Sequence, residues 1–178
     1  WAYNEPPPIH AVVRIAEAAG AVVQSHRTDA DLTVRPRYPA SPWEWTTTSP
    51  DVTIYDDLVL QISGAVETKP LYNEVFISAE AKGVQGFFKR QGEGGGEYAP
   101  QFVHPLISTA LVHAEAGRNI LSDRGGQTHW TFAEFPLFPA PVLPGQIGLV
   151  EPLQLALVVE AGGSWMGQVM STRLAWSR

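Results

Sequence analysis

The central part of the chain most constrains the fold, because it sets a single helix among short strand-like runs. Asn73–Ala79 alternates apolar and polar residues with the period of a half-buried strand. Val84–Arg90 is a second strand-like run, and the glycine loop Gly92–Gly96 follows it. Within Ile107–Asp123 the apolar residues keep to one helical face, and Gln127–Leu137 predicts a returning strand. This order predicts a β-barrel or sheet with one helix packed against it.

Composition indicates a folded chain and excludes several classes of site. Of the 178 residues, 44% are hydrophobic and 17% charged, which suits one ordinary domain or two small ones with a real core. The absence of cysteine excludes disulfides, thiolate zinc sites and cysteine nucleophiles. The formal charge of -6 has the wrong sign for a protein that grips phosphates. No run approaches the roughly 18 apolar residues of a membrane span, so none is expected.

The first 50 residues predict a separate module. Ile9–Ala19 is an amphipathic helix that follows three prolines, and Ala21–Ser25 with Leu32–Tyr38 predicts a hairpin whose loop exceeds two residues. Arg37–Asp51 is the expected linker, since it combines prolines with Trp43 and Trp45. The predicted domains are therefore residues 1–50, a helix plus β-hairpin module with a Pro/Trp linker, and residues 51–178.

Residues 51–178 predict a β-barrel domain with one helix, at about 107–123. Val59–Ser63 is a short strand-like run that Gly64 is expected to break. Leu153–Glu160 and Ser164–Trp176 flank two glycines and predict a terminal hairpin. The fold class is thus α+β, mainly β. The chain opens on Trp1 without a methionine and ends at Arg178, and we expect it to be cut from a longer protein.

None of the polar clusters has the spacing of an active site. The loop Gly92–Gly96 carries acidic residues and no Lys-Ser/Thr, which favours a mobile hairpin tip over a phosphate cradle. His104, His113 and His129 lack the three-to-five-residue spacing of zinc ligands. Ser164 lacks a nucleophile elbow. We therefore expect no enzyme, and no catalytic, cofactor or metal residues.

The acidic side chains and one aromatic pair leave other functions open. The carboxylates of Asp56, Asp57, Glu67, Glu74 and Glu80 could hold a glycosidase pair, although a solvated face explains them as well. A sequence with two phenylalanines beside Lys-Arg also occurs in single-strand binders, which the negative net charge disfavours.

Four aromatic residues are the candidate partner-interface residues: Trp43, Trp45, Phe87 and Phe88. Consecutive residues of a strand face opposite sides, so at least one of Phe87 and Phe88 is expected to be covered by another domain or subunit. Trp43 and Trp45 share a parity and could both face a partner.

Segments spread over most of the chain resemble the strand, turn and helix signatures of one known family. They are Ile15–His26, Leu32–Pro39, Tyr72–Ser78, Val84, Phe87–Arg90, His104–Ile107, Leu143–Gly145, Val150–Glu151 and Trp165–Val169. In these segments the chain resembles the baseplate hub protein of long-tailed bacteriophages, of the Mu-like prophage type. The resemblance is one of structural signatures and includes no catalytic motif.

The resemblance implies a tail-tube-like β-barrel with one packed helix, flanked by a small helix–β-hairpin module. In the full-length form three copies make a ring that joins the tail tube to the spike, and DNA passes through the lumen without specific binding. It implies no cofactor, and a place in the virion tail after assembly in the bacterial host cytoplasm. The family's full chain is about twice as long as this one. An acidic wall, which repels a polyanion, suits such a conduit.

Three alternatives remain open at this point. The spike hub of a bacterial type VI secretion machine shares the architecture of the phage hub. A carbohydrate-binding β-barrel would use Trp43, Trp45 and Trp130 as stacking platforms. A glycan hydrolase would need two carboxylates roughly 5–10 Å apart in a cleft.

Overall fold

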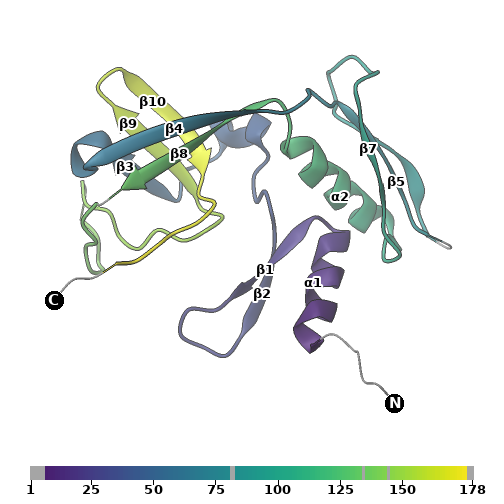
Figure 1. Cartoon of the computed structure of the whole chain (residues 1–178), viewed down its shortest axis with the longest axis horizontal. Helices are drawn as coiled ribbons and strands as arrows, with labels where there is room; N and C mark the ends of the chain where they lie inside the picture. The colour runs from purple at the N-terminus through teal and green to yellow at the C-terminus, as the bar shows by residue number, and fades with distance from the viewer. Residues whose placement is uncertain (1–6, 81–82, 134, 144, 176–178) are drawn as a thin grey trace. The chain divides into compact units, whose positions relative to one another are not determined.

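The computed structural model describes residues 7–80, 83–133, 135–143 and 145–175. Across these residues the chain is built mostly of strands with few helices, which confirms the α+β, mainly β class (Figure 1). The described strands form four sheets of two or three strands each, and none of these sheets closes into a barrel. The tail-tube-like barrel therefore stays a prediction. Among the same residues, no helix has the length and apolar character that crossing a bilayer requires.

The chain folds into two compact units, each made of two separate segments. Unit 1 consists of Trp1–Pro39 and Thr68–Gly126, and unit 2 consists of Ala40–Glu67 and Gln127–Arg178. The domain division expected between residues 50 and 51 differs from this one and stays a prediction.

The first part of unit 1 is the helix–hairpin module expected from the sequence. Helix α1 (Pro8–Ala18) starts with a proline at its first position, where the missing N–H costs no hydrogen bond. Strands β1 (Ala21–Ser25) and β2 (Leu32–Pro36) then pair as an antiparallel hairpin. Gly20 joins helix and hairpin with a φ of 64°. A Cβ at this position would lie 2.6 Å from the Cβ of Asn119. The turn therefore requires glycine both for its positive φ and for the space beside Asn119.

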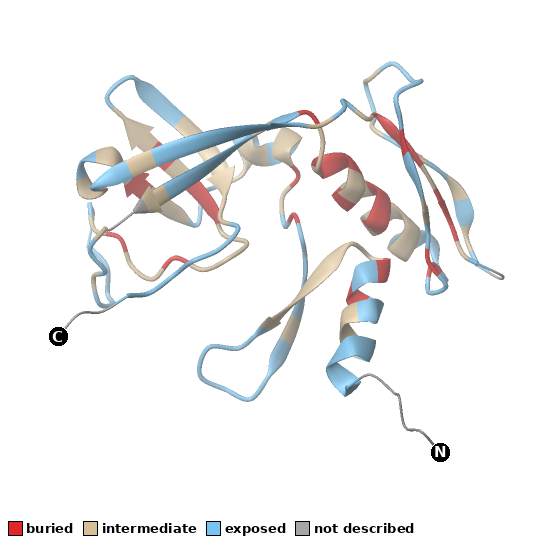
Figure 2. Cartoon of the chain, viewed as in Figure 1, coloured by how far each residue is buried: buried red, intermediate tan, exposed pale blue. Residues whose placement is uncertain are grey.

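The second part of unit 1 is a three-stranded sheet, with helix α2 (Ala110–Ser122) covering one face. Strand β5 (Glu74–Ser78) lies in the centre, between antiparallel β6 (Gln85–Lys89) and parallel β7 (Tyr98–Val103). Figure 2 shows the buried residues concentrated on α2 and β5. The predicted helix is confirmed within three residues at each end, and Thr109 caps it by accepting a hydrogen bond from the amide of Val112 (3.3 Å).

The buried residue Asn119 connects α2 to the helix–hairpin module. Its Oδ1 accepts a hydrogen bond from the Tyr38 amide (3.0 Å), and its Nδ2 donates to the Ala19 carbonyl (3.2 Å). Both partners are backbone groups close to the ends of α1 and β2 in the helix–hairpin module, so a single buried side chain pairs with polar backbone groups at both places.

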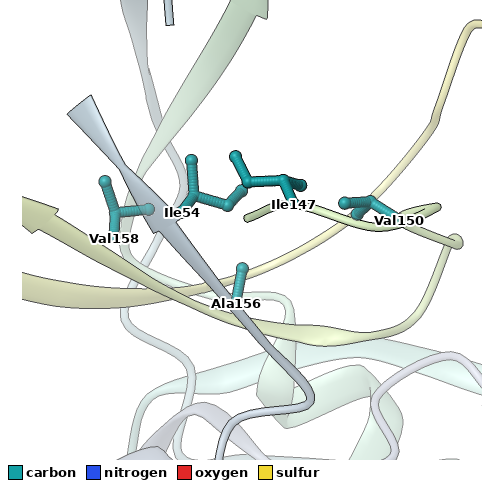
Figure 3. Packing of buried hydrophobic residues seen from close by; sticks show 5 residues of the cluster. All are labelled: Ile54, Ile147, Val150, Ala156 and Val158. Carbon is teal, nitrogen blue, oxygen red and sulfur yellow. The ribbon is translucent and has the colours of Figure 1, made fainter. Parts of the chain in front are cut away.

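Unit 2 is organised around the sheet β10–β9–β3. Strand β3 (Val52–Tyr55) runs parallel to β9 (Leu155–Glu160), and β10 (Gly163–Gln168) returns antiparallel to β9 as the predicted terminal hairpin. The expected second strand, Ser164–Trp176, is too long, because β10 ends at Gln168 and residues 169–175 form no strand; Trp176 itself lies outside the described residues. A buried cluster of aliphatic side chains fills the inner face of this sheet (Figure 3). It consists of Ile54, Ile147, Val150, Ala156 and Val158.

Strands β4 (Gln61–Thr68) and β8 (Gly126–Ala133) pair as a two-stranded sheet, most of it in unit 2. The expectation that Gly64 ends this strand is wrong, because β4 runs on for four residues beyond it. The ring of Trp130 lies against Gly64, where a Cβ would come within 2.9 Å of a ring carbon. The glycine therefore makes room for an aromatic ring and leaves the strand intact.

Candidate functional site: an aromatic sheet face

An aromatic cluster lies on the face of the β6–β5–β7 sheet that α2 does not cover. Phe76, Phe87 and Tyr98 form it, one from each strand, and we call it the aromatic face. The ring centroids of Phe76 and Phe87 are 5.0 Å apart in an edge-to-face arrangement, and those of Phe87 and Tyr98 are 5.9 Å apart. Phe87 is 61% exposed and Tyr98 57%. Two large rings are thus held in fixed positions with more than half of their surface in contact with solvent.

The opposite face of the same sheet is sealed by α2. Val75 and Ile77 are fully buried, and the ring of Phe88 lies against Gly117 of the helix. Phe87 and Phe88 therefore face opposite sides, as the strand period predicts, and Phe88 is covered within its own unit. The predicted role of Phe88 at a partner interface stays a prediction, whereas Phe87 presents most of its ring to solvent.

The glycine loop between β6 and β7 is tied to the rest of unit 1. The expectation that this loop is a hairpin tip is wrong, because β6 and β7 do not pair with each other. They lie on opposite sides of β5, and the loop crosses the end of that strand. Both carboxylate oxygens of Glu93 accept hydrogen bonds from Arg124 (2.7 Å each), and Glu93 also pairs with Arg90. The side chain of Asn73 bonds to the Gly94 carbonyl and to the Glu97 amide (3.1 Å for the amide). These contacts fix the loop beside the aromatic face.

An ion pair marks the rim of the aromatic face next to this loop. Lys89 Nζ lies 2.8 Å from a carboxylate oxygen of Glu74, and the glutamate side chain is only 11% exposed. Gly95 lies over the pair, since a Cβ there would come within 2.3 Å of the same oxygen. Glu74 was one of the candidate catalytic carboxylates, and the structure gives it a cation and a loop instead of a cleft.

Trp43 and Trp45 lie in a short helical turn of unit 2, η1 (Pro42–Thr47), and both are half-buried. Ser41 and Glu44 cap this turn through hydrogen bonds in both directions. The indole N–H of Trp45 donates to the Ala40 carbonyl (3.1 Å). The linker expected here is thus partly a folded turn, and no contact described in the structure tests whether the two rings meet a partner.

Trp130, which was a candidate sugar platform, is stacked within unit 2. Its ring centroid lies 5.3 Å from that of Trp165, with 29° between the planes, and Phe132 lies 6.1 Å from Trp165. Gly64 lies against the ring of Trp130 as well. The stack on Trp165 uses a ring face that a sugar would need, and Trp130 is 43% exposed in total.

Two of the histidines and two of the remaining carboxylates make contacts within the fold. His104 is buried and accepts a hydrogen bond from the Leu106 amide (3.2 Å), and His129 lies 2.9 Å from the exposed Glu67. Asp56 accepts a hydrogen bond from the Ala161 amide (3.3 Å). Within the described ranges, no three His, Asp or Glu side chains come close enough together to hold a metal ion.

Among the described residues, Asp123 is the one carboxyl with a clearly shifted pKa, and sequence reasoning did not single it out. Burial raises the pKa of this group, but the hydrogen bond and charge of Lys69 (2.7 Å), the charge of Arg37 (3.8 Å) and the hydroxyl of Tyr38 (3.1 Å) together outweigh that effect. The net result is a pKa below the usual range. The partners lie 54 or more residues away in the sequence, so no local pattern could indicate them.

The net charge of the chain lies entirely in unit 2. That unit contains eight of the 18 acidic residues but only two of the 12 basic ones, which leaves it with a formal charge of -6. Unit 1 contains the other ten acidic and ten basic residues and is formally neutral. The aromatic face thus belongs to the unit without net charge.

Comparison with models of protein families, with curated proteins and with solved structures gives no match to the chain.

Proposed function

We propose that this chain is a non-enzymatic structural component of a phage or prophage tail baseplate hub. In this proposal three copies form an adaptor between the tail tube and the spike, and DNA passes along the axis without specific binding. The protein would be assembled in the bacterial host cytoplasm and act in the virion tail. The tail-tube-like β-barrel is part of the same proposal, with the open edges of the small sheets as the places where further strands would close it.

The observation that carries the proposal is the amount of large apolar surface left open. Eighteen large hydrophobic side chains of the described residues are exposed by 39% or more. Single exposed hydrophobics are normal on any protein, but rings gathered on one sheet face are typical of an interaction surface. A subunit that completes its burial only against neighbours would leave such surfaces open.

The charge distribution supports the part of the proposal that concerns DNA. A surface that bound the phosphate backbone would need clustered Lys and Arg. Unit 2 instead concentrates negative charge, which repels a polyanion and would let it slide past.

Sedimentation velocity of the full-length protein over a wide concentration range tests the proposal. We expect a species with three times the mass of one full-length chain at concentrations up to about 500 µM. Addition of double-stranded DNA should leave the boundary unchanged at low salt. A full-length protein that is monomeric at every concentration would refute the assembly, and tight DNA binding would refute the conduit.

A further inference from the structure

We infer that the aromatic face of unit 1 is the surface through which one copy of this chain contacts the next. The inference deepens the proposed function and rests on it, because it names the contact by which the proposed subunits associate. Its starting point is that Phe87 and Tyr98 are the two most exposed aromatic residues of the described chain and touch each other.

The aromatic face is already organised before any partner binds. The helix α2 packs against the back of the sheet, the contact between Phe76 and Phe87 fixes the ring positions, and the Glu93–Arg124 pair holds the adjacent loop. A partner would therefore order few side chains on binding, which removes much of the entropic cost of association. Rigid aromatic rings in such positions are the residue types that dominate binding energy at interfaces.

The size of the aromatic face suits the centre of an interface. At 61% and 57% exposure, Phe87 and Tyr98 together present about 250 Å². A standard interface buries about 800 Å² per partner, with an apolar centre inside a polar rim. Exposed polar residues of the same sheet lie around the rings and supply such a rim: Gln85, Lys89 and Gln101.

Charge favours another copy of the chain as the occupant. Unit 1 has equal numbers of acidic and basic residues, so it offers no long-range attraction to a polyanion or a polycation. At the rim, the nearly buried Glu74 already neutralises Lys89, so the aromatic face presents little net charge that would repel a second copy of the chain. A nucleic acid would require a basic surface around the rings, which the sheet lacks among its described residues.

The test compares the oligomeric state of matched variants of the full chain by sedimentation velocity. Phe87→Ser and Tyr98→Ser should each weaken self-association at least about 30-fold, the equivalent of a 2 kcal/mol hot spot. Leu111→Ser is the control, because Leu111 is 73% exposed but lies on α2, away from the aromatic face. It should associate like the unchanged chain, and a thermal melt of each variant checks that it is folded.

The outcomes separate this inference from the proposed function. If the unchanged chain associates and both aromatic variants do so equally well, the inference is wrong and the proposed assembly stands. Loss of association in Leu111→Ser alone would overturn it in the same way. If the unchanged full-length protein is monomeric throughout, both the assembly and the inference are wrong. Weakening by both aromatic substitutions, but not by the control, supports the inference.

Discussion

Substituting Gly117 with alanine tests how the sheet of unit 1 packs on its helix. A methyl group at this position would lie 2.2 Å from Cγ and 2.5 Å from Cβ of Phe88. Carbon atoms in good contact are about 3.5–4.0 Å apart, so the helix and strand would have to separate by roughly 1 Å. Rotation of the phenylalanine ring cannot relieve the clash, because the backbone of β6 fixes the Cβ atom.

The expected effect has the opposite sign from the usual one. In an exposed helix interior, replacing glycine by alanine stabilises by about 1 kcal/mol through helix propensity. Overpacking a buried site costs about 1–3 kcal/mol, and a clash with a backbone-fixed atom belongs at the upper end of that range. We therefore expect a net loss of about 2 kcal/mol in the free energy of unfolding. For a unit of roughly 100 residues this lowers the melting temperature by about 10 °C.

Urea titration and thermal melts followed by circular dichroism measure this difference. Leu111→Ala is the matched control on the same helix, since it exchanges two good helix formers at an exposed site and should shift stability by less than about 0.5 kcal/mol. A Gly117→Ala variant that melts at a higher temperature than the unchanged chain would show that Phe88 does not pack against α2.

Two further predictions concern charged groups of unit 1. Glu93→Gln should lower the free energy of unfolding by about 1 kcal/mol and speed amide hydrogen exchange in residues 92–96, because Arg124 and Arg90 lose their carboxylate partner. Glu97→Gln is the control, since Glu97 has no side-chain partner among the described contacts, and its amides should exchange like those of the unchanged chain. Equal exchange rates in all three proteins would contradict the role of Glu93 in fixing the glycine loop. Asp123 has a folded pKa below its unfolded one, so its contribution to stability is complete at neutral pH and is lost as the pH falls below about 4. The difference in urea midpoint between Asp123→Asn and the unchanged chain should therefore be larger at pH 7 than at pH 3, and a constant difference would argue against the lowered pKa.

The sequence predicts the elements of this fold better than their partners. The helix α2, strand β5 and the first hairpin follow from periodicity and capping, which are properties of neighbouring residues. Pairing is not local: β3 lies parallel to β9, about a hundred residues further along the chain, and no turn signal links them. The glycine loop Gly92–Gly96 is a second case. Its glycines predict a mobile backbone, but Glu93 is held by Arg124, which lies 31 residues away and cannot be identified from local sequence.

At the candidate site, too, the sequence predicts what depends on neighbouring residues and does not predict contacts between distant ones. Strand parity correctly places Phe87 and Phe88 on opposite faces, but it cannot say which face the helix will cover. Gly117 carries that information, because only a residue without a side chain admits the Phe88 ring. Tyr98 joins the aromatic face through the parallel pairing of β7 with β5, which the sequence does not indicate.

The two phenylalanines of β6 should therefore affect two different measurements, the free energy of unfolding and the strength of self-association. Phe88 contributes to the packing of unit 1 on α2, so a change opposite it acts on the free energy of unfolding. Phe87 is 61% exposed, so its replacement should act mainly on association and should lower the melting temperature less than Gly117→Ala does. If Phe87→Ser instead destabilised unit 1 as strongly as Gly117→Ala does, the exposed ring would be part of the fold itself, and the aromatic face would lose its role as a contact between copies.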